Sequence, residues 1–202
     1  MDSGNDVSIK AFSEAEGALL IRLARQALMT RLGMAVDAAE QAAVNKAVNA
    51  PIFKAVRGTF VTLTLAGQLR GCIGHLTGIA ALAESVRQNA VSAGFHDPRF
   101  TPLTVAELAA VAIEISILTE PCPLDYADAD DLISRLRPRV DGVILAHQGA
   151  SATFLPQVWQ QLPKPEAFLS HLCMKAGLTA ERWRGGDLNV SIYHVQSFEE
   201  KV

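Results

Sequence analysis

The feature that most constrains the fold of this 202-residue chain is a pair of adjacent strand-like segments joined by a short glycine turn. Residues 58–66 alternate polar and apolar side chains and are rich in β-branched residues, and Gly67-Gln68 can turn the chain back into residues 69–73. Strands joined by so short a turn pair antiparallel. The sequence therefore predicts a β-hairpin and, with it, a sheet that is at least partly antiparallel.

Helices are predicted before this hairpin. Ser13 and Glu16 have the spacing of a capping box, and apolar residues then recur at helical spacing up to Gly33. Asp37 and Glu40 repeat the pattern ahead of a second helix, which must end before Pro51 because the residue before a proline avoids helical geometry.

Helices and strands also follow the hairpin. The pattern predicts a helix capped by Thr77-Gly78 and ended by Gly94, a strand over residues 111–118, a hairpin over 141–155, a helix over 165–176 and a strand over 188–195. Hairpins outnumber βαβ units in this order. We therefore expect an α+β fold: a mainly antiparallel sheet flanked by helices, within a single domain over residues 8–200. A smaller helical subdomain is expected to be attached to it, over residues 77–110.

Composition narrows the class of protein. Hydrophobic residues make up 50% and charged residues 19% of the chain, as in an ordinary globular protein. The net charge of −3 lacks the basic excess that nucleic-acid binding requires, so we expect no nucleic-acid partner. No apolar run approaches the ~20 residues needed to cross a bilayer, and the first ten residues do not resemble an export signal, so we expect no membrane span.

The cysteines and glycines bear on compartment and cofactor. Three scattered cysteines, Cys72, Cys122 and Cys173, are too few for a disulfide framework, and a reducing cytoplasm is the expected location. The chain has no phosphate loop, no dinucleotide-binding glycine pattern and no three-cysteine cluster for an iron–sulfur centre. We therefore expect no cofactor.

The main candidate site is the segment Leu69-Arg70-Gly71-Cys72-Ile73-Gly74-His75-Leu76. Glycine allows unusual backbone angles and close approach of other atoms, so Gly71 and Gly74 indicate a turn or bulge that presents Cys72. Cations, protonated histidines and helix N-termini favour the reactive thiolate form of cysteine.

Two interpretations of Cys72 remain open. In the first, Cys72 is a nucleophile or covalent carrier, Arg70 stabilises its anion, His75 or His96 moves protons, and the helix expected after Thr77 points its N–H groups at the thiol. In the second, Cys72 is a small buried residue with no chemistry, and Arg70 binds a carboxylate or backbone carbonyls.

A second candidate segment is His96-Asp97-Pro98-Arg99-Phe100. A histidine beside a carboxylate suits proton transfer, but an aspartate-proline turn is the interpretation we favour, with Asp97 capping backbone N–H groups and pairing with Arg99. Cys72 and His75 have a spacing that metals use, yet a single such pair does not make a four-ligand site, and no metal is expected.

Several separated blocks of this sequence resemble the AMMECR family. They are Gly58-Thr59-Phe60-Val61-Thr62-Leu63, Leu69 to Gly74, the stretch from Ala93 through Asp97-Pro98-Arg99-Phe100 and Pro102, Ala152 to Trp159, and Lys175-Ala176-Gly177-Leu178. The sequence departs from the family pattern directly after the glycine motif, where His75 stands in place of a threonine; Leu76 follows it, at a position where the family has an aromatic residue or leucine.

The resemblance implies a fold and a context. The fold is a larger α+β part on an antiparallel sheet with a smaller, mainly helical part. The context is the AmmeMemoRadiSam system, in which this chain would be component A beside a Memo-like protein and a radical S-adenosylmethionine enzyme. The resemblance establishes no reaction.

The function expected from the sequence is an accessory or substrate-handling component of that system. Its candidate site comprises Arg70, Cys72, His75 and His96, with Gly71, Gly74, Asp97 and Arg99 for binding. The alternative is a free-standing enzyme that uses the Cys72 thiolate as nucleophile and His75 or His96 as base. The sequence does not decide between a component that is an enzyme and one that is not.

Overall fold

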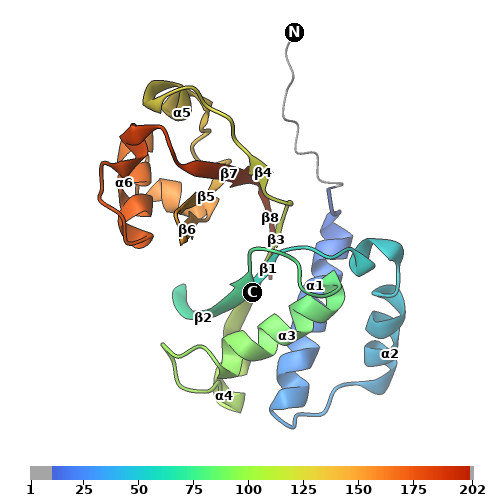
Figure 1. The fold of residues 1–202 in the computed structure, drawn as a ribbon. Helices are drawn as coiled ribbons and strands as arrows, with labels where there is room; N and C mark the ends of the chain where they lie inside the picture. The colour runs from blue at the N-terminus through green and yellow to red at the C-terminus, as the bar shows by residue number, and fades with distance from the viewer. Residues whose placement is uncertain (1–10, 201–202) are drawn as a thin grey trace. The chain divides into compact units, whose positions relative to one another are not determined.

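The structure, a computed structural model, describes residues 11–200, and these divide into two units (Figure 1). The larger unit contains residues 11–118 and 196–200, and the smaller unit contains residues 119–195. Each unit has its own hydrophobic core. Both contain helices and an antiparallel sheet, which confirms the expected α+β class.

The larger unit packs helices on one face of a four-stranded sheet. Its strands follow the order β2-β1-β3-β8, and both neighbours of β1 run antiparallel to it. Its elements are α1 (Glu14–Arg31), α2 (Ala38–Ala47), η1 (Pro51–Lys54), β1 (Thr59–Leu65), β2 (Gln68–His75), α3 (Leu82–Phe95), α4 (Val105–Leu108), β3 (Val111–Leu118) and β8 (Val195–Glu199).

The first two helices begin where the sequence predicts. The Ser13 hydroxyl accepts a hydrogen bond from the Glu16 N–H and the Glu16 carboxylate binds Ser13 in return, so the predicted capping box of α1 is confirmed. Asp37 caps α2 by accepting from the Glu40 N–H, and α2 ends at Ala47, before Pro51.

The predicted hairpin is β1 and β2. Its turn lies at Ala66 and Gly67, whose φ angles of 49° and 75° are both positive, as tight hairpin turns require. The turn therefore begins one residue earlier than predicted. The pairing runs from Thr59 opposite His75 to Leu65 opposite Gln68, and it shifts between Leu63 and Thr64, where Arg70 is the extra residue of a β-bulge.

Alternation along β1 gives the sheet two different faces. Val61 and Leu63 are buried in the core with residues of α1 and α3. Thr62 points to the opposite face, where Cys72 on β2 and Glu114 on β3 are its cross-strand neighbours. This second face carries polar side chains and the candidate cysteine.

The helix predicted after Thr77-Gly78 begins later than expected. Helix α3 starts at Leu82, whose N–H donates to the Ala55 carbonyl, and no side chain caps it. Gly78 instead allows close backbone approach, because a Cβ there would lie 2.5 Å from the Arg57 nitrogen. At its other end α3 continues to Phe95, because Gly94 is a packing position against Leu28 and not a C-cap.

The smaller unit is built on a second sheet, with strand order β4-β7-β5-β6. Its elements are β4 (Cys122–Pro123), α5 (Ala129–Arg135), β5 (Gly142–His147), β6 (Ala150–Phe154), η2 (Pro156–Gln160), α6 (Pro165–Lys175), η3 (Arg182–Gly185) and β7 (Asn189–Tyr193). The indole of Trp159 stacks on Phe168 with ring centroids 3.7 Å apart, and both rings lie in the core of this unit.

The late strand predicted over residues 188–195 is shorter than expected and is followed by another. Strand β7 ends at Tyr193, and β8 begins at Val195 and joins the sheet of the larger unit. The sequence analysis did not predict β8. Among residues 11–200 no helix combines the length and the hydropathy needed to cross a bilayer.

Candidate functional site

Both backbone polar groups of Cys72 are held by one ion pair. The Cys72 N–H donates to Asp97 Oδ2 at 2.9 Å, and Arg99 Nη2 donates to the Cys72 carbonyl at 3.3 Å. Arg99 in turn binds Asp97 through Nε and Nη2, at 2.9 and 2.6 Å. We call this arrangement the Asp97–Arg99 clamp.

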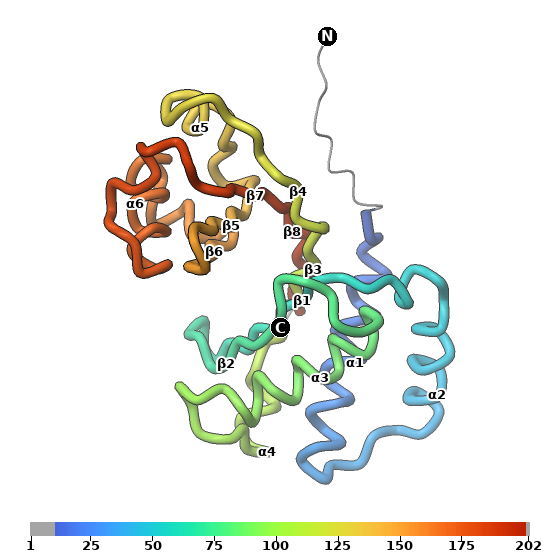
Figure 2. Tube along the Cα trace, in the orientation of Figure 1, coloured from blue at the N-terminus to red at the C-terminus, as the bar shows by residue number. Residues whose placement is uncertain are grey.

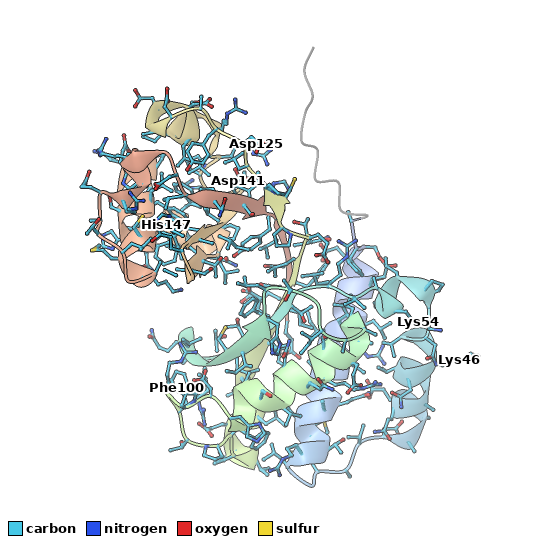
Figure 3. The ribbon with its side chains drawn as sticks, viewed as in Figure 1. Lys46, Lys54, Phe100, Asp125, Asp141 and His147 are labelled. Atoms are coloured by element: carbon cyan, nitrogen blue, oxygen red, sulfur yellow. The ribbon has the colours of Figure 1, made fainter. Side chains whose placement is uncertain are left out.

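The clamp exists because β2 lies at the edge of its sheet. An edge strand leaves a row of N–H and C=O groups without a strand partner. The loop that follows α3 covers this edge and supplies Asp97 and Arg99 (Figure 2). Figure 3 labels Phe100 in the same loop. The predicted aspartate-proline turn is thus formed. The Asp97 carboxylate accepts from the Arg99 N–H within the turn and from the Cys72 N–H on β2, which is distant in sequence.

Asp97 is a buried carboxyl whose surroundings favour its ionised form. It is 4% exposed, and the Arg99 guanidinium together with the N–H groups of Cys72 and Arg99 holds its pKa well below the usual range, against the opposing effect of burial. A carboxyl that stays ionised at neutral pH does not donate protons. Asp97 therefore orients the Cys72 backbone and does not act as an acid.

Arg70 makes a second ion pair beside the clamp. Arg70 is 8% exposed, and its Nε and Nη2 donate to the two carboxylate oxygens of Glu107 at 2.8 and 3.2 Å, while Nη2 also donates to the Thr101 carbonyl at 2.9 Å. The Arg70 guanidinium lowers the pKa of Glu107 to about 2, helped by hydrogen bonds from Thr104. Arg70 therefore binds a carboxylate and a carbonyl, as the second interpretation of the sequence expects.

Gly71 and Gly74 lie within β2 at positions where the backbone of another segment approaches too closely for a side chain. A Cβ at Gly71 would lie 2.1 Å from the Ala93 carbonyl oxygen, and one at Gly74 would lie 2.2 Å from the Thr59 carbonyl oxygen. Neither residue has a positive φ. The predicted turn at these glycines is wrong. The predicted bulge is present, but it lies at Arg70.

The Cys72 thiol is half-buried and has a hydroxyl partner. Thr62 Oγ1 donates to Cys72 Sγ at 3.3 Å. The two residues are directly opposite each other on β1 and β2. Because the backbone groups of Cys72 bind the clamp instead of β1, this is the pair type in which side chains come closest. The register of β1 and β2 thus produces the contact between Cys72 and Thr62.

The two histidines do not join this arrangement. His75 is the exposed last residue of β2, and alternation places it on the face opposite to Cys72. His96 is the exposed C-cap residue of α3. Among the hydrogen bonds of residues 11–200, neither histidine contacts Cys72. The helix N-terminus expected beside the thiol is not there. The first N–H of α3, at Leu82, donates to the Ala55 carbonyl, and it is the C-terminal end of α3, at Ala93, that lies against Gly71.

The structure brings three further residues to the site that the sequence analysis did not select. They are Thr62 beside the thiol, and Glu107 and Thr101 around Arg70. The pattern Thr104-x-x-Glu107 is a capping box, and it is present at α4, so the position of Glu107 at a helix start was detectable from sequence. Its pairing with Arg70 was not.

The other cysteines have different surroundings. Cys173 is buried in α6, and burial raises the pKa of its thiol. Cys122 lies half-buried in β4. Within the described part of the chain, no group of three or more histidine, cysteine, aspartate or glutamate side chains is placed to hold a metal ion.

Comparison with known proteins gives a consistent result. The AMMECR1 family model matches residues 21–198. A protein of Thermofilum pendens is 37% identical over 93% of this chain and 91% of its own length, and a protein of Methanosarcina barkeri is 39% identical over 75% of this chain and 74% of its own. The crystal structure of an uncharacterised Pyrococcus horikoshii protein aligns with a TM-score of 0.75 at 30% identity, covering 92% of this chain and 91% of that one.

Proposed function

This chain belongs to the AMMECR1 family, and on that premise we propose that it is an accessory, substrate-handling component whose site is the Cys72 thiol on β2. We further propose that it acts with a Memo-like protein and a radical S-adenosylmethionine enzyme. In this proposal the partners supply the radical chemistry, and this chain positions a substrate or an intermediate.

The observation that carries the proposal is the way Cys72 is held. The Asp97–Arg99 clamp binds both backbone polar groups of Cys72, and the thiol stays half-buried. A site residue fixed by its surroundings loses little conformational freedom when a ligand binds. A cysteine retained only for packing is more often fully buried, as Cys173 is.

The surroundings of the thiol favour binding over unaided catalysis. Within the described residues its hydrogen-bond partner is Thr62, a hydroxyl that does not accept a proton at neutral pH. A free-standing enzyme would need His75 or His96 to move to Cys72 before either could act as base. That rival remains testable, because it requires activity of this chain alone.

The test uses purified proteins. We expect the full-length chain to form a complex with the Memo-like protein or the radical enzyme of the same organism, measured by analytical ultracentrifugation at micromolar concentrations. Cys72→Ser should keep the complex and lose the activity of the assembled system. Absence of any complex would contradict the accessory role. Catalysis by the isolated chain that disappears in Cys72→Ser would favour the enzyme instead.

A further inference from the structure

A groove of about 1000 Å³, with both polar and apolar side chains in its lining, lies between the three long helices of the larger unit. Each helix contributes one stripe of side chains, so that residues three or four positions apart share a face. The side chains that matter here are Gln26 and Arg31 of α1, Gln41 and Asn45 of α2, and Arg87 and Gln88 of α3. Figure 1 shows these three helices side by side.

Helix α2 buries little of its surface. Of its ten residues only Val44 is buried, and Gln41 and Asn45 are the two that line the groove. Helices α1 and α3, in contrast, pack closely where Gly94 meets Leu28. Arg22 on α1 and Glu40 on α2 pair at 3.1 Å and tie the two helices at the side.

Gln26 has a buried side-chain nitrogen, Nε2, without a hydrogen-bond partner among the described residues. The residue lines the groove and is 7% exposed. A buried donor left unpaired destabilises the fold, so native proteins rarely keep such a group without a use. Because Nε2 itself is closed to solvent, the Gln26 amide has to turn toward the groove before it can donate to a ligand there.

The charged lining of the groove is cationic. Arg87 donates to Asn45 Oδ1 at 2.6 Å and has one carboxylate neighbour, Glu84, at 3.7 Å. Arg31 lies over the Phe95 ring, 5.0 Å from its centroid, and has no carboxylate partner among the ion pairs of residues 11–200. Among the described residues no acidic side chain lines the groove. A concave surface with a net positive lining attracts anions.

We propose that this groove binds a small organic anion. The oxyanion group of the ligand pairs with Arg31 and Arg87, and the Gln26 amide turns toward the groove so that its Nε2 donates to an acceptor of the ligand. Leu23 and Val91 supply an apolar wall for the rest of the molecule. The volume is at the upper end of pockets for small organic ligands, roughly 300–1,000 Å³, so a lone inorganic ion would leave most of the groove empty. The site is independent of Cys72 and of the proposed function.

The test is a binding titration of the full-length chain with four probes: AMP, citrate, adenosine and inorganic phosphate. We expect AMP or citrate to raise the unfolding temperature by a few degrees in a saturable way, with adenosine and inorganic phosphate much weaker. The better of the first two identifies the oxyanion as phosphate or carboxylate. A failure of both at millimolar concentration, or equal binding of inorganic phosphate, would overturn the proposal.

Variants locate the binding. Arg31→Gln should weaken the organic anion roughly tenfold to a hundredfold, because it removes a charge-assisted pair at an exposed residue. Lys46→Gln removes one positive charge from α2, at a residue that Figure 3 labels and that does not line the groove, and should leave the affinity unchanged. Equal loss in both variants would indicate nonspecific attraction and contradict the site.

Gln26→Leu separates the ligand role from a structural one. Removal of an unpaired buried amide should keep or raise the unfolding temperature of the free protein while abolishing the shift caused by the ligand. If this variant does not fold, the side-chain amide resonance of Gln26 in the wild-type NMR spectrum gives the same information. That resonance should move on titration, and a resonance that stays fixed would contradict the proposal.

Discussion

The Cys72 N–H donates to the buried Asp97 carboxylate at 2.9 Å, across 25 residues of sequence. This bond joins the edge of a sheet to the loop that follows α3, and Arg99 completes it by binding the carboxylate and the Cys72 carbonyl. The Asp97 carboxylate thus positions Cys72 through its backbone, whereas the hydrogen bond to the thiol comes from Thr62.

Loss of the Asp97 carboxylate should loosen this edge of the sheet. We expect Asp97→Ala to lower the free energy of unfolding by about 2–4 kcal/mol, because it leaves the partly buried Cys72 N–H unpaired and frees Arg99. Denaturant titration checks this value. Arg99→Ala removes the more exposed partner and should lower the free energy of unfolding by a smaller amount. Equal losses in the two variants would show that Asp97 stabilises the protein only through Arg99.

Stability should fall with acidification. The pKa of Asp97 and that of Glu107 are both lowered in the folded protein, so each carboxylate stabilises the fold above its unfolded pKa, and this stabilisation disappears as pH falls toward the folded value. For Glu107 that window runs from 4.5 down to about 2. We expect the unfolding free energy to drop across this range. Glu107→Gln should flatten the curve, and an unchanged curve would contradict the assigned pairing with Arg70.

The ion pair between Arg70 and Glu107 should be specific for arginine. Both carboxylate oxygens and the Thr101 carbonyl bind the planar guanidinium, a geometry that lysine does not reproduce. We expect Arg70→Lys to destabilise the protein, with a coupling energy to Glu107→Gln of about 1–3 kcal/mol in a double-mutant cycle. Simple additivity of the two changes would refute the coupling.

Gly71 should tolerate no side chain. The Cβ of an alanine would overlap the Ala93 carbonyl oxygen, so Gly71→Ala must push α3 away from β2, at a cost of about 3 kcal/mol or more. Gly67→Ala is the matched control in the same hairpin. There the Cβ meets open space and only the positive φ opposes it, at about 1–2 kcal/mol. Thermal unfolding of the two variants ranks them, and a milder effect at Gly71 would count against the packing.

The sequence predicts the local elements well because their signals are local. The capping box of Ser13 and Glu16 fixes the start of α1, and alternation over residues 111–118 identifies β3. Gly177 follows α6 with the positive φ expected of a glycine after a helix end. Each of these signals acts within a few residues of the backbone it shapes.

What the sequence does not predict depends on packing between distant segments. Gly71 and Gly74 indicate an unusual backbone in the sequence. The structure has no turn there, and the glycines are required because Ala93 and Thr59 approach them closely. The pairing of Arg70 with Glu107 spans 37 residues. Strand β8 has a pattern too short to identify alone, and it forms because the sheet beside β3 accepts it.

The contact between Thr62 and Cys72 offers a direct test of the site. Thr62→Val keeps the shape of the side chain and removes the hydroxyl that donates to the thiol, and Thr64→Val makes the same change two residues along the strand. The measurement is the rate of Cys72 alkylation in the native protein by peptide mass spectrometry, with Cys122 and Cys173 as internal references.

We expect half-buried Cys72 to react in the folded protein, buried Cys173 to react only after unfolding, and Thr62→Val, but not Thr64→Val, to change the Cys72 rate. A Cys72 that stays inert until the protein unfolds would contradict the central claim that the fold presents this thiol for use.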